Sequence, residues 1–164
     1  MSASPSPTSR LSSRFRALGH RLYADYLMPD RFGAYRALLE AALKAGYRFE
    51  TIEDHWARCR GQRPEPGEKV FILRHDIDSD PVAGEKLFDI EASLGIRSSY
   101  YFRLGTLDAR LMDRIQAQGG EVSYHYEELA TLIKAKGLRS RAEAVAHLPE
   151  ATDHFEANLR RLRE

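Results

Sequence analysis

The chain has 164 residues, of which 43% are apolar and 30% are charged, and its formal net charge is +1. The length suits one domain with its own core, and no apolar stretch approaches the roughly 20 residues of a membrane helix. The nearly balanced charge gives no electrostatic case for nucleic-acid binding. The single cysteine, Cys59, excludes an internal disulfide and favours a reducing, cytoplasmic location.

The amino-terminal residues differ in composition from the rest of the chain. The segment MSASPSPTSRL is rich in Ser and Pro, and no acidic residue occurs between Met1 and Ala24. Such a segment buries too little apolar surface to offset the entropy lost on ordering. We therefore expect a disordered basic tail over residues 1–24, for which a transit peptide is the alternative, and a single α/β domain over residues 25–164.

Apolar spacing, helix caps and Gly or Pro breaks predict the elements of the first half. Residues 32–45 are expected to form an amphipathic helix that Gly46 ends, and apolar and polar residues then alternate over 47–52. A short helix is expected to open at Asp54, before a Pro- and Gly-rich loop over 61–69.

The second half predicts a repeating order of strand and helix. The apolar run 70–73 is expected to be a strand buried on both faces, and Asp80 and Pro81 should begin the next helix. The remaining elements are strands over 98–102 and 121–124, and helices over 81–95, 108–118, 127–136 and, broken near Pro149, 140–163. This repetition favours parallel βαβ units, whose sites lie at the carboxyl ends of the strands.

The number of expected strands is small for a sheet that must cover its edges. We therefore expect a chain that is incomplete at its carboxyl end. An unpaired sheet edge would permit self-association of the chain.

Three residues near the expected strand ends are candidates for chemistry. Asp76 and Asp78 are two apart, so an extended backbone places both carboxylates on one side. Two close acids need a cation, a shared proton or hydrogen-bond donors. His125 follows the third strand at the same rim, and imidazole together with carboxylate suits zinc. Strand-end caps and a structural histidine are the alternatives.

Other polar residues near this rim have supporting roles or none. His75 should point away from Asp76, as a packing residue or one that supports the site from behind. Arg74 and Arg103 end strand-like runs and could orient carboxylates, bind an anionic group or form salt bridges.

Further candidates are weaker. His55 and Cys59 have the i, i+4 spacing of helical metal ligands, although Cys59 is expected to be a small core residue. His147 and His154 are expected to face solvent. The sequence contains no glycine loop for phosphates and no G-x-S-x-G, so nothing supports a nucleotide site or a Ser–His–Asp site.

Three segments, LRHDIDSDP, LGIRSSYYFRL and GGEVSYHYE, together resemble the NodB-like polysaccharide deacetylase family, in particular a bacterial branch whose first motif reads H-D-x-D. The resemblance covers about residues 32–164 and is most specific over 70–128. It implies a partial, distorted (β/α) barrel, here truncated after about three βα units. It also implies a metal-dependent, usually zinc-dependent, hydrolase in carbohydrate metabolism that cleaves an N-acyl carbon–nitrogen bond other than a peptide bond.

The resemblance also implies roles for individual residues. Asp76 would be the catalytic base, and Asp78 and His125 would be metal ligands. The family's second histidine position falls on Leu129, which cannot bind metal, so the carboxylates next in line as substitute ligands are Glu127 and Glu128. The family's later motifs, including its general-acid histidine, have no counterpart here, so we expect weak or absent turnover by this chain.

The expected partner is a carbohydrate or an N-acylated small molecule. Arg103 and Tyr126 are the expected substrate-binding residues, with Arg74 and His75 supporting the acids.

A non-catalytic glycan-binding module is the first alternative, in which rim aromatics stack on sugar rings. A D-x-D phosphohydrolase with Asp76 as nucleophile is the second, although Ser79 and Asp80 stand where that class has small Gly and Thr or Val residues.

Overall fold

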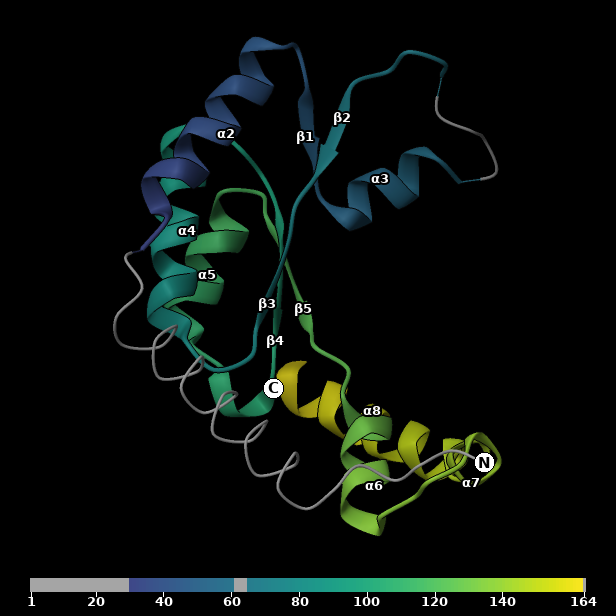
Figure 1. Ribbon diagram of the computed structural model, residues 1–164. Helices are drawn as coiled ribbons and strands as arrows, with labels where there is room; N and C mark the ends of the chain where they lie inside the picture. The colour runs from purple at the N-terminus through teal and green to yellow at the C-terminus, as the bar shows by residue number, and fades with distance from the viewer. Residues whose placement is uncertain (1–29, 61–64, 164) are drawn as a thin grey trace, which may run out of the picture. The chain divides into compact units, whose positions relative to one another are not determined.

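The computed structural model describes residues 30–60 and 65–163 (Figure 1). The tail expected over 1–24 lies outside the described residues, as do the first four residues, 61–64, of the loop expected over 61–69. The chain divides into two units, residues 1–35 and 36–164. The first is described only from residue 30 onward, and helix α2 continues from it into the second. In the described ranges no helix has both the length and the apolar character that crossing a membrane requires.

The first elements follow the expected order with small shifts. Helix α2 (Phe32–Lys44) stops before Gly46, which adopts a left-handed φ of 82°. Strand β1 (Arg48–Glu50) and helix α3 (Ile52–Arg58) come next. The helix begins before Asp54 because the hydroxyl of Thr51 accepts a hydrogen bond from Asp54 N at 3.0 Å and caps the first turn.

The expectation of one doubly buried strand over 70–73 is wrong. The segment contributes β2 (Val70–Ile72) and, after Leu73, the chain enters a separate strand, β3 (Arg74–Ile77). Strand β2 pairs only with β1, in parallel, and Ile72 is exposed. A two-stranded sheet has too few neighbours to cover both faces. The apolar side chains instead pack locally, as Phe71 does on Phe49 with ring centroids 5.2 Å apart.

The larger sheet has the order β3-β4-β5, and its strands are all parallel as expected. Helix α4 (Pro81–Ser93) leads from β3 to β4 (Ser99–Phe102), and α5 (Ala109–Ala117) leads from β4 to β5 (Glu121–Tyr124). Aspartates cap both helices, and the expected cap is confirmed by a 3.0 Å bond from Ala83 N to the Asp80 carboxylate.

The hydrophobic core lies between this sheet and helices α4 and α5, which cover one of its faces (Figure 1). Its buried members are Ile77, Phe88, Tyr100, Phe102, Leu111 and Ile115. Each large apolar side chain buried here contributes roughly 1.5–3 kcal/mol relative to an exposed one. The core therefore fixes the strands that carry the candidate residues.

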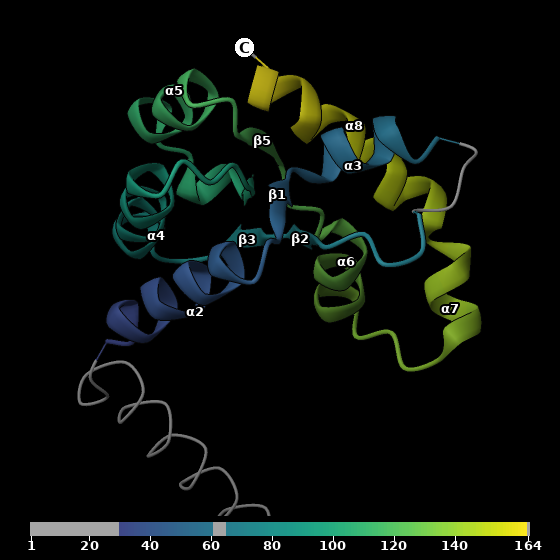
Figure 2. The same cartoon turned by 90° about the horizontal axis from the view of Figure 1, so that it is seen from above.

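Three further helices gather at the carboxyl ends of the strands, on the side away from α4 and α5 (Figure 2). They are α6 (Glu128–Lys136), α7 (Arg141–Ala146) and α8 (Leu148–Arg163). The short 3-10 helix η1 (Leu104–Thr106) lies between β4 and α5 in the chain. The break expected near Pro149 falls at His147, because Pro149 fits in the first turn of α8, where its missing N–H is no loss. The described residues thus form a mixed α/β fold with small parallel sheets and no closed barrel.

Candidate functional site

The carboxyl ends of the three parallel strands bring the candidate residues to one edge. Asp78 follows β3, Arg103 follows β4 and His125 follows β5. The ladder continues one residue beyond β5, since His125 N donates to Phe102 O at 2.8 Å. That bond holds the His125 backbone beside the end of β4.

The two aspartates point to the same side, as their spacing predicts. Ile77 between them is 5% exposed and joins the core, whereas the side chains of Asp76 and Asp78 are 38% and 52% exposed. The imidazole of His125 lies close to both. Its Nε2 is 3.5 Å from Asp76 Oδ2, and its Nδ1 is 3.2 Å from Asp78 Oδ1.

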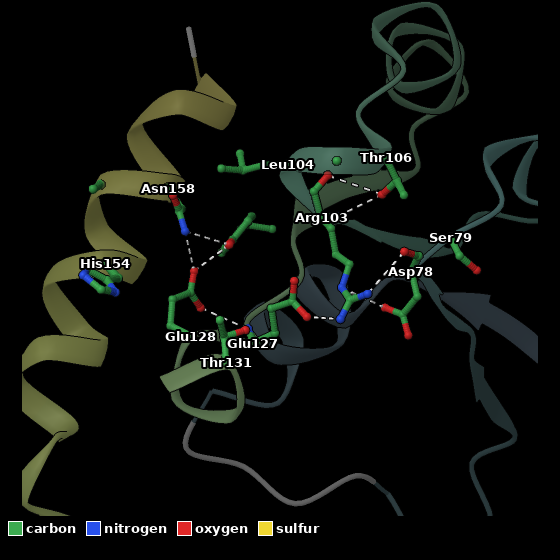
Figure 3. Close-up of a pocket in the computed structure, with 13 residues that line it drawn as sticks. Asp78, Ser79, Arg103, Leu104, Thr106, Glu127, Glu128, Thr131, His154 and Asn158 are labelled. Atoms are coloured by element: carbon green, nitrogen blue, oxygen red, sulfur yellow. Dashed lines mark hydrogen bonds and ion pairs between the residues drawn. The ribbon is translucent and has the colours of Figure 1, made fainter. Parts of the chain in front are cut away.

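Two arginines compensate the charge of the aspartates. Arg74 Nε donates to Asp76 Oδ1 at 2.7 Å. Arg103 Nε lies 3.6 Å from Asp78 Oδ1, and Arg103 Nη1 donates to the Asp78 carbonyl at 3.3 Å. Figure 3 shows the Arg103 guanidinium between Asp78 and Glu127. The guanidinium also forms an ion pair with the Glu127 carboxylate. Each aspartate carboxylate therefore already has a positively charged neighbour.

The two glutamates that sequence reasoning offered as substitute ligands have other partners. Glu127 pairs with Arg103. Glu128 is buried, and its Oε1 accepts hydrogen bonds from Tyr124 Oη at 2.5 Å and Asn158 Nδ2 at 2.9 Å. Within residues 30–60 and 65–163, no three His, Cys, Asp or Glu side chains are arranged as a ready metal site. The buried Nδ1 of His125 makes no hydrogen bond among the described residues, and the nearest carboxylate oxygen, Asp78 Oδ1, lies 3.2 Å from it.

His75 lies on the opposite side of β3 from the aspartates, as expected from strand alternation. Its Nε2 is 2.6 Å from Oε1 of Glu91. Glu91 is 1% exposed, and its other carboxylate oxygen, Oε2, accepts hydrogen bonds from Ser98 Oγ and Tyr100 Oη. Burial alone would raise the pKa of Glu91, but these hydrogen bonds and the charge of His75 bring it below its ordinary value. His75 therefore secures α4 to the sheet through Glu91.

A pocket of about 640 Å³ opens beside the aspartate–histidine group. Asp78 and Arg103 form one wall, η1 the next, and α6 and α8 the far side (Figure 3). Burial and the hydrogen bond to Glu128 raise the pKa of Tyr124 in this wall to about 12. Tyr126 is exposed and packs edge-on against Phe155, with ring centroids 5.5 Å apart, and it does not line the pocket.

Sequence reasoning missed the residues that η1 and α8 contribute. Thr106 Oγ1 donates to the carbonyl of Ile77 and so fixes η1 over the end of β3. Asn158 bridges Tyr124 Oη and Glu128 from α8, and His154, which was expected to face solvent only, is exposed and lines the pocket. The sequence did carry a signal for the buried face of α8, namely the helical spacing of four residues: Ala151, Phe155, Asn158 and Leu162.

In comparisons with known proteins, no family model, no curated protein and no solved structure matches this chain.

Proposed function

We propose that the chain is a metal-dependent hydrolase of the polysaccharide deacetylase type, which cleaves the N-acyl carbon–nitrogen bond of an N-acylated sugar. The observation that carries the proposal is the convergence of Asp76, Asp78 and His125 at one edge of three parallel strands, beside a pocket that begins at Asp78. The consecutive βα units also support a partial, distorted (β/α) barrel as the finer description of the fold, because such folds place their sites at this edge.

Asp78 and His125 are the residues that would hold the metal. A carboxylate oxygen and an imidazole nitrogen suit zinc. Nδ1 of His125 makes no hydrogen bond among the described residues and lies 3.2 Å from Asp78 Oδ1, so this pair of ligand atoms fits such an ion. When bound, the ion supplies Lewis acidity to the acyl carbonyl and to an attacking water.

Asp76 has the position of a general base. Its Oδ1 is held by Arg74 Nε, which leaves Oδ2 on the side of His125. The carboxylate is 38% exposed, so water can approach it. Asp76 Oδ2 would accept the proton of a water that attacks the acyl carbon.

The pocket has the size and lining for a sugar. Its volume of about 640 Å³ lies within the usual range of small-molecule sites. Arg103 offers N–H donors to hydroxyl or acyl oxygens, and Tyr126 lies outside the lining, two residues beyond the end of β5. Because Leu129 supplies no ligand, we expect a weakly held ion and slow turnover.

A glycan-binding module without catalysis is the second candidate. One observation favours it, namely that Arg74 and Arg103 already compensate Asp76 and Asp78 without any added cation. A protein of this kind would bind the sugar in the pocket whether or not a metal is present.

The test measures acetate release from N-acetylglucosamine oligomers with zinc, and oligomer binding by calorimetry with and without a chelator. We expect slow, zinc-dependent acetate release that falls by roughly 100-fold or more in Asp76→Asn, in line with loss of a general base. Asp113→Asn, an exposed carboxylate on α5, serves as the matched control and should keep the wild-type rate.

Two results would reject the deacetylase proposal. One is acetate release that is unchanged in Asp76→Asn. The other is oligomer binding that is equal with and without zinc and is accompanied by no hydrolysis, which would establish the glycan-binding module in its place.

A further inference from the structure

Tyr101 of β4 lies on the face of the larger sheet opposite α4 and α5, the face that also carries Asp76. Strand alternation explains this placement. Tyr100 and Phe102 are 1% and 0% exposed in the core, so Tyr101 between them points to the other face. Tyr101 is also the register partner of Asp76 on the neighbouring strand β3. Its side chain therefore lies on the same face, and at the same level of the sheet, as the proposed base.

Arg74 connects the ring of Tyr101 to the carboxylate of Asp76. The guanidinium carbon of Arg74, Cζ, lies over the Tyr101 ring at 4.3 Å from its centroid, which is the geometry of a cation–π contact. The same guanidinium donates from Nε to Asp76 Oδ1 at 2.7 Å. The guanidinium therefore rests on the aromatic ring while it holds the base.

The ion pair of Arg74 and Asp76 needs a second contact because it is open to solvent. The two side chains are 46% and 38% exposed. An exposed ion pair gains little in water, and a long arginine side chain loses rotamer freedom when it is held in one position. The ring of Tyr101 restricts that freedom in advance, since a planar guanidinium stacks on an aromatic face. Arg74 is therefore held against Asp76 by two contacts in place of one.

Glu121, the first residue of β5, fixes the ring of Tyr101 in turn. Tyr101 Oη donates to Glu121 Oε1 at 3.0 Å. The other oxygen, Glu121 Oε2, accepts hydrogen bonds from Ser99 Oγ at 2.6 Å and from Glu53 N at 3.0 Å. Burial and the hydrogen bond to Glu121 raise the pKa of Tyr101 to about 12, so the hydroxyl keeps its proton and remains a donor. The ring is therefore held at its hydroxyl end as well as by its strand.

We propose that Tyr101 is a positioning residue of the candidate site, which acts through Arg74 on the proposed base Asp76. This role rests on the proposed hydrolase function, because Asp76 is a base only in that reaction. While Arg74 holds Oδ1 of Asp76, Oδ2 stays on the side of His125, 3.5 Å from its Nε2, where it would accept the proton of the attacking water. Tyr101 does not line the pocket, so its loss should alter the orientation of the base and not the binding of substrate.

Acetate release from N-acetylglucosamine oligomers with zinc measures the effect of Tyr101 on the reaction. In Tyr101→Leu, which removes the ring face, we expect kcat to fall about fivefold, the size of a partly exposed cation–π contact, with KM unchanged. Tyr101→Phe keeps the ring face and should retain most of the wild-type rate. In Arg74→Ala, the further change Tyr101→Leu should cause no additional loss, because Tyr101 acts through Arg74. Tyr47→Leu is the matched control, since Tyr47 is an exposed tyrosine that packs on Phe71, and it should keep the wild-type rate.

A second measurement needs no turnover. The Nε proton of Arg74 exchanges with solvent when it leaves Asp76, and NMR follows the rate of this exchange. We expect the rate to rise about fivefold in Tyr101→Leu, for the same reason as above, and to stay near the wild-type value in Tyr101→Phe. The wild type alone covers the case that Tyr101→Leu does not fold, because the ring of Tyr101 should shift the side-chain proton signals of Arg74 upfield.

Three results would overturn the role of Tyr101. They are an equal exchange rate in wild type and folded Tyr101→Leu, a double variant whose loss is the product of the two single losses, and Arg74 signals without an upfield shift. Absence of acetate release by the wild type would instead reject the hydrolase proposal, and the exchange rate would still decide whether Tyr101 holds Arg74.

Discussion

At the scale of single residues, the candidate site depends on contacts that hold its loops in place. Thr106 is the clearest case, because its buried hydroxyl donates to the carbonyl of Ile77, the last residue of β3 before Asp78. A buried carbonyl that loses its donor retains the cost of its lost hydration. This hydroxyl therefore helps to hold η1, and with it one wall of the pocket, at the end of β3.

Replacing Thr106 with Val tests that contact, because the change keeps the shape and removes the donor. We expect the free energy of unfolding in urea to fall by about 1–3 kcal/mol. Thr131→Val is the matched control, since Thr131 is an exposed residue of the pocket wall, and should stay within about 0.5 kcal/mol of wild type. Equal stability of the two variants would mean that the Thr106 hydroxyl contributes nothing to the site.

At the scale of elements, two adjacent glycines connect α5 to β5 and have different tasks. Gly119 has a φ of 75°, a conformation that side chains with a Cβ rarely adopt. Gly120 has no such φ, but a Cβ there would lie 2.7 Å from Ile115 Cγ2 and 3.2 Å from the Ser98 carbonyl. The sequence pattern marked both glycines as a helix end, whereas the close approach at Gly120 was visible only in three dimensions.

Gly120→Ala is therefore expected to lower the free energy of unfolding by about 1–3 kcal/mol through overpacking. Gly33→Ala on α2 is the control, because the position has open space and a helical backbone, and it should be neutral or slightly stabilising. Urea unfolding of both variants gives the comparison. A neutral Gly120→Ala would show that α5 can move away from the sheet without loss.

At the scale of the whole molecule, the ionic network around Glu50 predicts how stability depends on pH. Hydrogen bonding from Arg58, joined by that from Arg48 and His55 and opposed by burial, lowers the pKa of Glu50 from 4.5 to about 2. A carboxyl group with a lowered pKa in the folded state stabilises the fold above its unfolded value. That stability is lost as the pH falls from about 4.5 through about 2.

The expected result is a melting temperature that drops over this range of pH, and a difference between wild type and Glu50→Gln that shrinks as the pH is lowered. Thermal unfolding by circular dichroism at several pH values measures both. Glu53→Gln, an exposed carboxylate on α3, should follow wild type throughout. A constant difference between wild type and Glu50→Gln would show that Glu50 does not titrate as described.

The sequence predicted the βαβ order and the common side of Asp76 and Asp78, because periodicity and caps are local properties. It could not predict how Val70 to Ile77 is divided between two sheets, since that depends on which strands are available as partners. It offered carboxylate pairing only as one of several roles for Arg74 and Arg103, because both arginines had several acids within reach. Contacts between residues distant in sequence determine that choice.

The most direct test of the central claim is a calorimetric titration of zinc into metal-free protein. We predict one-to-one binding that is lost in both Asp78→Asn and His125→Ala and is kept in Asp113→Asn. Absence of binding by the wild type, or binding that neither substitution weakens, would contradict it, and Asp76, Asp78 and His125 would then be an ion-pair cluster with Arg74 and Arg103 in place of a metal site.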